Sequence, residues 1–127
     1  MDLGLKDKVV IVTGGAKGIG EGIVAVLVNE GAIPVIVGRN AEDNQKTASS
    51  FAGKKVLQVV AELSDPAACE KAVKEVIAQA GRIDGLVNNA GVNDGVNLEH
   101  GNYERFMEAF TKTWCIIIYW RIMLCLN

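Results

Sequence analysis

The chain has 127 residues, of which 50% are hydrophobic and 22% charged, so it has the composition of one globular domain with a buried core. Its formal net charge of -2 excludes the basic footprint of a nucleic-acid-binding domain or of a protein held on an anionic membrane surface. Its three cysteines lack metal-site spacing and no secretory signal is recognisable, which favours a cytoplasmic protein without a metal. The most apolar stretch, residues 114–126, is too short to span a bilayer and contains Arg121.

Apolar strands and amphipathic helices alternate from residue 9 to residue 91. The continuous apolar run Val9–Val12 predicts a strand covered on both faces, and Ile19–Val28 predicts the helix that follows it. The elements expected next, in chain order, are a strand at 33–37, a helix at 41–52, a strand at 56–61, a helix at 66–80 and a strand at 83–87. This alternation predicts an α/β fold, a Rossmann-type doubly wound parallel sheet with a ligand crevice at the carboxyl ends of its strands.

Residues that start and stop helices support these boundaries. Asn40 is a candidate N-cap, and Ser64-Asp65-Pro66 has the pattern of a helix start with a capping side chain and a proline in the first turn. Gly31 and Gly81 stand where a helix ends in the left-handed conformation. Cys69 lies on the apolar stripe of the helix expected at 66–80, so we interpret it as a core residue rather than as a reactive thiol.

The turn between the first strand and the first helix has the pattern of a phosphate cradle. It reads Thr13-Gly14-Gly15-Ala16-Lys17-Gly18-Ile19-Gly20. Gly14 permits the tight turn, Gly18 lets the backbone approach a pyrophosphate, and Gly20 lets the helix lie against the strand. The helix start then directs N–H groups and a positive dipole end at the anion. A glycine pattern alone also occurs in turns that serve only packing, but the strand and helix around this one indicate nucleotide binding.

A second motif, Asn88-Asn89-Ala90-Gly91, follows the fourth expected strand. Together with the glycine turn, it resembles the short-chain dehydrogenase/reductase family over about residues 5–110, and Asp84 also fits the family's usual approach to the fourth strand. The resemblance implies an oxidoreductase that moves hydride between a nicotinamide dinucleotide and a hydroxyl or carbonyl carbon of a small molecule. It also implies strand order 3-2-1-4, with later strands missing here, and homo-oligomeric full-length relatives.

The family pattern assigns cofactor-binding roles to particular residues of this chain. The pyrophosphate turn is assigned to Gly14, Gly18, Ile19 and Gly20, and the surroundings of the adenine-side ribose to Asn88, Ala90 and Gly91. For Asn88, a purely structural role in holding two strands together is about as well supported. Glu62 stands where the family usually has an aspartate at the adenine edge, and its extra methylene alters that contact.

The choice between NAD and NADP depends on the residues after the second strand. An NAD enzyme would have a carboxylate there for the ribose 2′-hydroxyl, whereas this chain has Gly38 followed by Arg39. Arg39 is suited to bind a 2′-phosphate bidentately, and Lys17 in the glycine turn adds a second cation on the same side. Either residue alone is more often a solvated surface residue. Together they predict NADP rather than NAD.

A looser resemblance concerns the segment from Asn88 to Gly101, which is similar to bacterial sugar dehydrogenases of the L-fucose type within this family. It would place Asn93 and Asp94 near a polyhydroxylated substrate. A turn that is rich in Asn, Asp and Gly because turns favour these residues is an equally good interpretation. His100 has no partner at a recognisable catalytic spacing, so we assign it no role.

The chain departs from the family in its C-terminal part. The family's Tyr-x-x-x-Lys is absent: Tyr103 and Tyr119 are followed four residues later by Met107 and Met123, so we assign no catalytic residue. We interpret residues 1–111 as an NAD(P)-binding half and residues 112–127 as an aberrant apolar tail. Read in a shifted frame, a permitted choice of codons for the tail yields a segment resembling the family's asparagine-bearing helix.

Three interpretations of function follow from this departure. The leading one is a short-chain dehydrogenase by descent and by binding site, truncated before its catalytic part and inactive alone. The second is a non-catalytic dinucleotide-binding module. The third is a translation product without function.

Overall fold

The computed structural model describes residues 1–91, 99, 101–108, 110–111 and 117–118. Strands and helices alternate through residues 1–91, as the sequence predicts. Their bounds are β1 (Val9–Thr13), α1 (Gly18–Asn29), β2 (Ile33–Gly38), α2 (Ala41–Ser50), β3 (Leu57–Val60), α3 (Pro66–Ala80) and β4 (Gly85–Val87).

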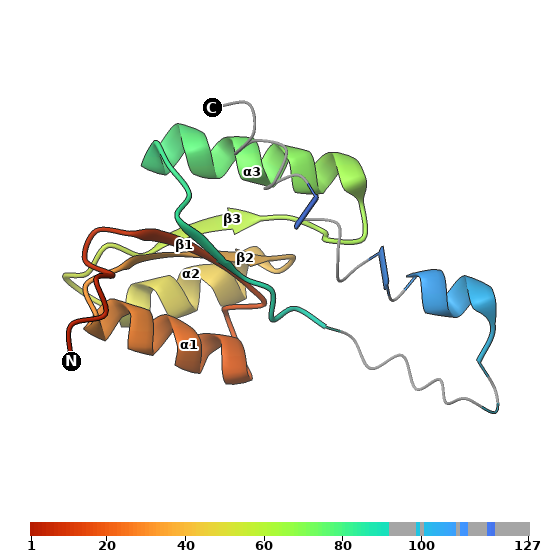
Figure 1. The fold of residues 1–127 in the computed structure, drawn as a ribbon, viewed down its shortest axis with the longest axis horizontal. Coiled ribbons are helices and arrows are strands. Elements are labelled where there is room, and N and C mark those ends of the chain that lie inside the picture. The colour runs from red at the N-terminus through yellow and green to blue at the C-terminus, as the bar shows by residue number, and fades with distance from the viewer. Residues whose placement is uncertain (92–98, 100, 109, 112–116, 119–127) are drawn as a thin grey trace.

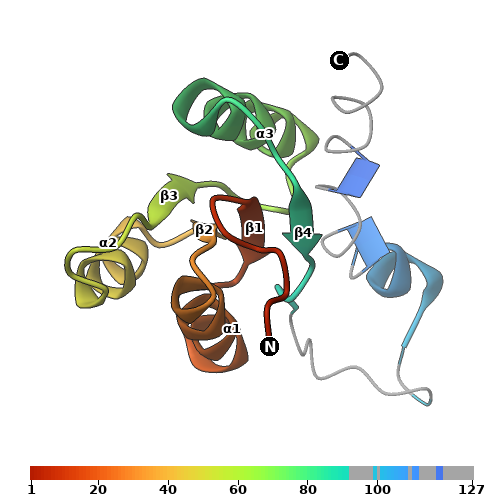
Figure 2. The same cartoon turned by 60° about the vertical axis from the view of Figure 1, so that its left-hand side comes forward.

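The four strands form one parallel sheet in the order β3-β2-β1-β4. The central strand β1 pairs with β2 on one side and β4 on the other, so Val12 lies opposite both Ile36 and Val87. Helices α1 and α2 cover one face of the sheet and α3 covers the other (Figures 1 and 2). The predicted fold class and strand order are therefore confirmed.

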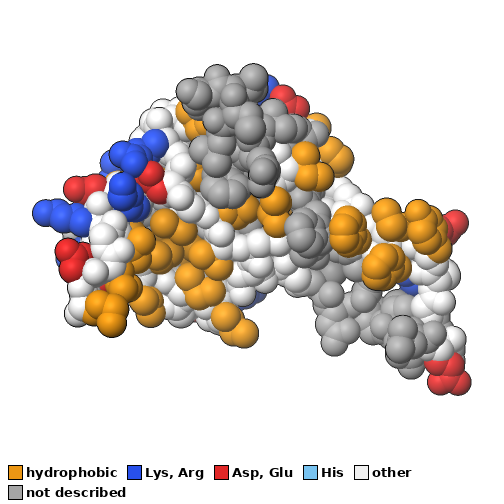
Figure 3. All heavy atoms as spheres, in the orientation of Figure 1, with side chains coloured by type: hydrophobic (Ala, Val, Ile, Leu, Met, Phe, Trp, Pro, Cys, Tyr) orange, Lys and Arg blue, Asp and Glu red, His pale blue; other side chains and the backbone are white. Residues whose placement is uncertain are grey.

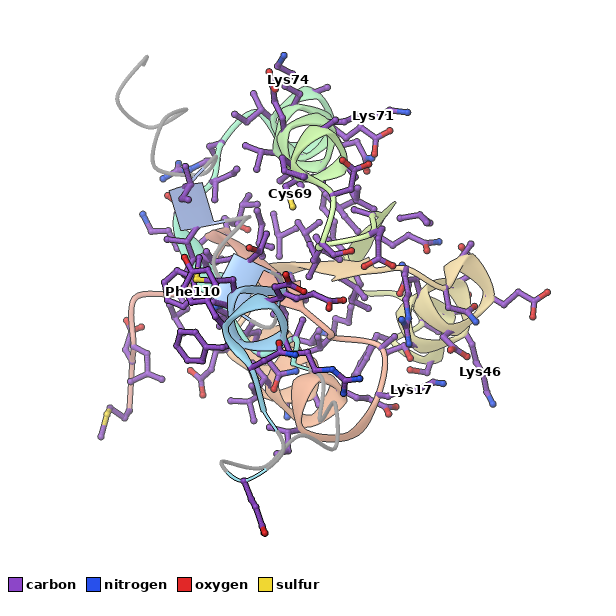
Figure 4. The ribbon with its side chains drawn as sticks, turned by 90° about the vertical axis from the view of Figure 1, so that its right-hand side faces the viewer. Lys17, Lys46, Cys69, Lys71, Lys74 and Phe110 are labelled. Carbon is purple, nitrogen blue, oxygen red and sulfur yellow. The ribbon has the colours of Figure 1, made fainter. Side chains whose placement is uncertain are left out.

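Alternate residues of the strands pack into two separate apolar layers. Ile11 of β1 belongs to the layer against α3, and its neighbour Val12 belongs to the layer against α1; both are fully buried. In the α3 layer, Cys69 is buried, points from the helix toward the sheet (Figure 4), and its Sγ lies 3.5 Å from the carbonyl oxygen of Leu63. Because both faces of the sheet are covered, its strands read as continuous apolar runs in the sequence.

The helix ends follow the capping residues in the sequence. The Asn40 side chain accepts a hydrogen bond from the backbone N–H of Asp43 at 3.1 Å, and the Asp65 side chain accepts one from Ala67 at 3.0 Å. Gly31 and Gly81 each have a φ of 79°, and the Gly81 amide donates to Ile77 at 2.8 Å. Local chemistry therefore determines where these helices begin and end.

Several expected element ends differ from the structure by one or two residues. The third strand is Leu57–Val60 rather than 56–61, and the helix expected at 41–52 ends at Ser50. The fourth strand begins at Gly85 rather than Ile83, because Ile83 is buried in the α3 layer and Asp84 bonds to β1. Tertiary contacts rather than local apolarity decide these ends.

Beyond the sheet, residues 103–108 and 110–111 are helical. The first turn of this helix is capped by Asn102, whose side-chain oxygen accepts from the Arg105 amide at 2.9 Å. Its exposed apolar side chains gather on a lobe beyond the sheet (Figure 3), and the rings of Phe106 and Phe110 stack 6.3 Å apart. Most of the expected tail, 112–116 and 119–127, lies outside the described residues.

Asp84 holds the entry of β4 against the entry of β1. Its Oδ2 accepts from the Val9 amide at 2.8 Å, and its own amide donates to the Val9 carbonyl oxygen at 2.8 Å. The Arg82 guanidinium donates to its Oδ1, with Nε at 3.0 Å. This hydrogen bond from Arg82, assisted by the one from Val9, lowers the pKa of the Asp84 carboxyl below its ordinary value against the opposing effect of burial.

We expect Asp84→Asn to lower the free energy of unfolding at pH 7 by about 1–2 kcal/mol, because a charge-assisted hydrogen bond becomes a neutral one. A lowered folded pKa means that the contribution is complete above the unfolded pKa, about 4, and is lost as pH falls through the folded pKa. Urea unfolding followed by circular dichroism from pH 7 to pH 2 should show the two proteins converging on the acid side. A constant difference across this range would contradict the assignment.

Candidate functional site

The site is built around the turn that joins β1 to α1. Gly14 has a φ of 66° and Gly18 a φ of 55°, values that favour glycine. A Cβ at Gly18 would meet no atom within 4 Å, so this part of the turn is open on the outside. The backbone at Gly18 therefore presents a surface that another molecule can approach closely.

Gly20 is the point of closest contact between α1 and the turn. A Cβ placed on Gly20 would lie 2.1 Å from the carbonyl oxygen of Gly14 and 2.7 Å from the amide nitrogen of the Asn89 side chain. No side chain fits in that space, and the helix start is held directly against the end of β1. The N-cap residue Lys17 makes no side-chain hydrogen bond to the first turn of α1, which leaves that helix start without a side-chain cap.

The turn is tied to the end of β4 through Thr13, which is fully buried. Its hydroxyl oxygen accepts hydrogen bonds from the backbone amides of Asn89 at 3.0 Å and Ala90 at 2.9 Å. The Asn89 side chain donates to the carbonyl oxygens of Thr13 at 3.2 Å and Gly14 at 3.3 Å. The two motifs, more than 70 residues apart in the chain, therefore form one rigid junction.

Asn88, which was expected to hold the strands together, contacts Thr13, and its neighbour Asn89 also bonds to the glycine turn. The Asn88 side-chain oxygen lies 3.5 Å from the Thr13 hydroxyl, at the limit of a hydrogen bond. The Asn89 side chain bonds to the turn at 3.2 Å and 3.3 Å, and no role was predicted from the sequence for Asn89 or Thr13. The signal was present in the sequence as a threonine directly before the glycine turn and a pair of asparagines after β4.

A hollow of about 170 Å³ opens beside this junction at the carboxyl ends of β1, β2 and β3. Its lining residues are Gly14, Val37, Gly38, Arg39, Ala61, Glu62, Leu63, Ala90 and Gly91. Five of the expected site residues thus share one cavity. Glu62 turns toward its own loop, where its Oε1 accepts hydrogen bonds from the Ser64 hydroxyl at 3.0 Å and the Ser64 amide at 3.3 Å.

A second hollow adjoins the first at Gly38, and both expected cations line it. Its lining residues are Gly14, Ala16, Lys17, Gly38, Arg39, Asn40, Asp43 and Asn44. Arg39 is exposed and makes no ion pair with a described residue, whereas the Lys17 ammonium lies 2.8 Å from the Asp43 carboxylate. The two expected cations, Lys17 and Arg39, therefore share this hollow with a carboxylate, that of Asp43, which was not predicted from the sequence.

Helix α2 holds the walls of this second hollow in place. The Asn44 side chain is buried and donates to the carbonyl oxygens of Gly38 at 3.0 Å and Val59 at 3.4 Å. The Thr47 hydroxyl donates to the carbonyl oxygen of Ala16 in the glycine turn at 2.8 Å. A Cβ at Gly38 would lie 2.6 Å from the Asn44 side-chain oxygen, so the pocket is shaped for glycine at that position.

Other expected features fall outside the site or outside the described residues. Ile19 is 79% exposed on the first turn of α1 and takes no part in either hollow. Residues 92–98 and His100, which carry the sugar-dehydrogenase resemblance, lie outside the described residues. Among the residues that are described, none group as three or more metal-ligating side chains, and no helix has the length and apolarity to cross a membrane.

We expect Gly20→Ala to lower the free energy of unfolding by about 2–3 kcal/mol, because its methyl group can be placed only by separating α1 from the turn. Gly22→Ala is the matched control on the same helix, since a Cβ there meets no atom within 4 Å. The control should raise stability by roughly 0.5–1 kcal/mol through helix propensity. Urea unfolding of both variants would show equal effects if the close contact at Gly20 were unimportant.

Comparison with known proteins agrees with this geometry. The sequence model of the family described as short chain dehydrogenase matches residues 8–113. The chain is 40% identical over 87 residues to meso-2,3-butanediol dehydrogenase of Serratia marcescens, covering 68% of this chain and 35% of that protein. It is 39% identical over 108 residues to the NADP-dependent (R)-specific alcohol dehydrogenase of Lentilactobacillus kefiri, covering 84% of this chain and 43% of that protein.

A solved structure with a similar fold is L-sorbose reductase of Gluconobacter frateurii, determined with NADPH and L-sorbose. It superposes with a TM-score of 0.78 at 28% identity, covering 97% of this chain and 51% of that one. The chain thus spans about half of that structure and 35% to 43% of the two curated relatives.

Proposed function

Because the chain belongs to the short-chain dehydrogenase family, we propose that its site binds NADP(H) and serves hydride transfer to or from a hydroxyl or carbonyl carbon. The observation that carries the proposal is the junction of Thr13, the glycine turn and the end of β4 beside two adjoining hollows. The bound nicotinamide supplies the redox chemistry, and the protein supplies binding and orientation.

The turn fits the pyrophosphate of such a cofactor. Gly18 is open to close approach, and the uncapped first turn of α1 offers N–H groups and the positive end of its dipole. We assign the pyrophosphate to Gly14, Gly18, Ile19 and Gly20, with Ile19 contributing its backbone rather than its exposed side chain. The adenosine end then lies in the first hollow, against Glu62, Ala90 and Gly91, with Asn88 at the end of β4.

The second hollow supports NADP over NAD. Its wall has two cations, Lys17 and Arg39, where a 2′-phosphate would lie. An NAD-type carboxylate at position 38 would collide with the buried Asn44 side chain, which leaves the ribose end of the pocket without that carboxylate. The relative from Lentilactobacillus kefiri is NADP-dependent by name, and the sorbose reductase was solved with NADPH.

We expect the chain to bind NADPH more tightly than NADH, as measured by calorimetric titration. Arg39→Asp should reverse this preference by about 1–3 kcal/mol, the scale of losing one charge-assisted pair and adding a repulsive charge. Arg105→Asp makes the same charge change on the distant helix at 103–108 and should leave the preference intact. Tighter binding of NADH by the unaltered chain would refute the assignment of the 2′-phosphate.

The 127 residues contain no Tyr-x-x-x-Lys that could transfer the proton of the reaction. A phenol whose pKa is lowered by a nearby lysine is the acid/base that the family resemblance implies. We therefore propose that this chain binds the dinucleotide and does not by itself complete the redox reaction. The non-catalytic binding module is the alternative that this same absence favours.

We expect the purified chain to show no NADP reduction with butanediol, secondary alcohols or sugar alcohols, while the same sample binds NADPH. The binding titration is the control, since it shows that the site is folded. Reproducible turnover by the chain alone would require an acid/base other than the tyrosine that the family uses.

We propose that the substrate is a small hydroxyl or carbonyl compound and that the protein is cytoplasmic. We also propose that its full-length relatives are homo-oligomers. A polyhydroxylated substrate of the L-fucose type is a finer proposal that depends on residues 88–101. It draws support from the similarity to a reductase solved with L-sorbose, whereas the butanediol and alcohol dehydrogenases favour smaller substrates.

A further inference from the structure

The carboxylate of Asp43 lies in the hollow to which we assign the 2′-phosphate. Lys17, Arg39, Asn40 and Asp43 all line this hollow, and Asp43 Oδ2 is 2.8 Å from Lys17 Nζ. One of the two phosphate-binding cations is therefore already paired with an anion of the same chain.

The two partners of this ion pair differ in how firmly they are held. The Asp43 side chain is 30% exposed and sits in the first turn of α2, where its charge is favoured by the helix dipole. Its backbone amide is bonded to the capping side chain of Asn40 at 3.1 Å. The Lys17 side chain is 76% exposed on a flexible four-carbon stem. In any rearrangement of the pair, the ammonium is the group that moves.

We propose that Asp43 is a specificity-determining residue that weakens the grip of this site on a 2′-phosphate relative to a 2′-hydroxyl. The inference rests on the proposed function of the site. Without Asp43, a phosphate would meet two positive charges, from Lys17 and Arg39. With Asp43, it meets a net charge of one and has to draw Lys17 away from a carboxylate that repels the phosphate.

A ribose 2′-hydroxyl meets the opposite situation. A hydroxyl can donate a hydrogen bond to a carboxylate, and it carries no charge for Asp43 to repel. The same side chain therefore disfavours NADP and is neutral or favourable toward NAD. Asp43 therefore reduces the preference for NADP over NAD that Lys17 and Arg39 create. It also provides a carboxylate at the hollow, whereas Gly38 has no side chain.

The size of the effect follows from the exposure of the pair. An exposed ion pair contributes a small free energy, so its removal should change phosphate affinity by about two- to fivefold. The change should shrink as salt is raised from 20 mM to 500 mM, because exposed charges are then screened.

The test is a calorimetric titration of NADPH and NADH into the full chain and four variants at low salt. The variants are Asp43→Asn, Glu42→Gln, Lys17→Met and the double variant Lys17→Met/Asp43→Asn. Asp43→Asn keeps the backbone bond to Asn40, so α2 keeps its cap, and circular dichroism checks this. Glu42→Gln is the matched control, since it removes an exposed charge from the same helical turn without touching Lys17.

We expect Asp43→Asn to strengthen NADPH binding two- to fivefold and to leave NADH unchanged or weakened. Glu42→Gln should produce a smaller gain, and the gain from Asp43→Asn should be reduced when Lys17 is already methionine. An equal gain from Glu42→Gln would show a general charge effect and overturn the proposal. Unchanged or weaker NADPH binding by Asp43→Asn would overturn it as well.

The role of Asp43 and the assignment of the cofactor are tested by different outcomes of the same titrations. If the unaltered chain prefers NADH but Asp43→Asn still shifts the ratio toward NADPH, the role of Asp43 stands and the cofactor assignment fails. If the chain prefers NADPH and Asp43→Asn does not move the ratio, the reverse holds. Binding of neither dinucleotide by any of the five proteins overturns both.

Discussion

The hydroxyl of Thr13 is the interaction on which the arrangement of this site depends. It is fully buried at the end of β1, and it satisfies two backbone amides that follow β4. Buried amides without a partner are costly, so the chain after β4 is held in one position relative to the glycine turn. The Asn89 side chain reinforces this junction from the other direction by donating to the turn itself.

Helix α2 adds a second set of constraints on the opposite side of the turn. Its Thr47 hydroxyl bonds to Ala16 in the turn, and its Asn44 amide bonds to the ends of β2 and β3. The helix thereby holds the turn in a fixed position relative to the two strands whose ends form the hollows. Since Gly20 leaves no space between α1 and the turn, the turn is fixed from three sides.

The charges around the second hollow are balanced rather than uniformly positive. Arg39 is exposed and makes no ion pair with a described residue, whereas Lys17 forms an ion pair with Asp43. An ion pair at the surface is weak, and its partners exchange readily with a bound anion. The binding free energies of a phosphate and of a hydroxyl at such a site differ by only a small amount, so a single charge change is enough to alter its preference.

Much of the architecture was determined by the sequence itself. The continuous apolar runs required strands covered on both faces, the caps at Asn40 and Asp65 began their helices, and Gly31 and Gly81 ended theirs. These features are local, because they depend on the side-chain period of a strand and on the backbone freedom of one residue. The glycine turn and the motif after β4 were likewise readable as neighbours once a parallel sheet was expected.

Only the tertiary structure decided which side chains hold the site together and which charges meet in it. Thr13 and Asn89 are 76 residues apart, and Lys17 of the glycine turn meets Asp43 of α2. No periodicity records such pairs, because a hydrogen bond or ion pair forms only when packing brings two side chains from different elements to within about 3 Å. The start of β4 was misjudged for the same reason, since the Asp84 side chain is bound to Val9. The sequence thus determined the elements and their order, and packing determined the contacts that make them a binding site.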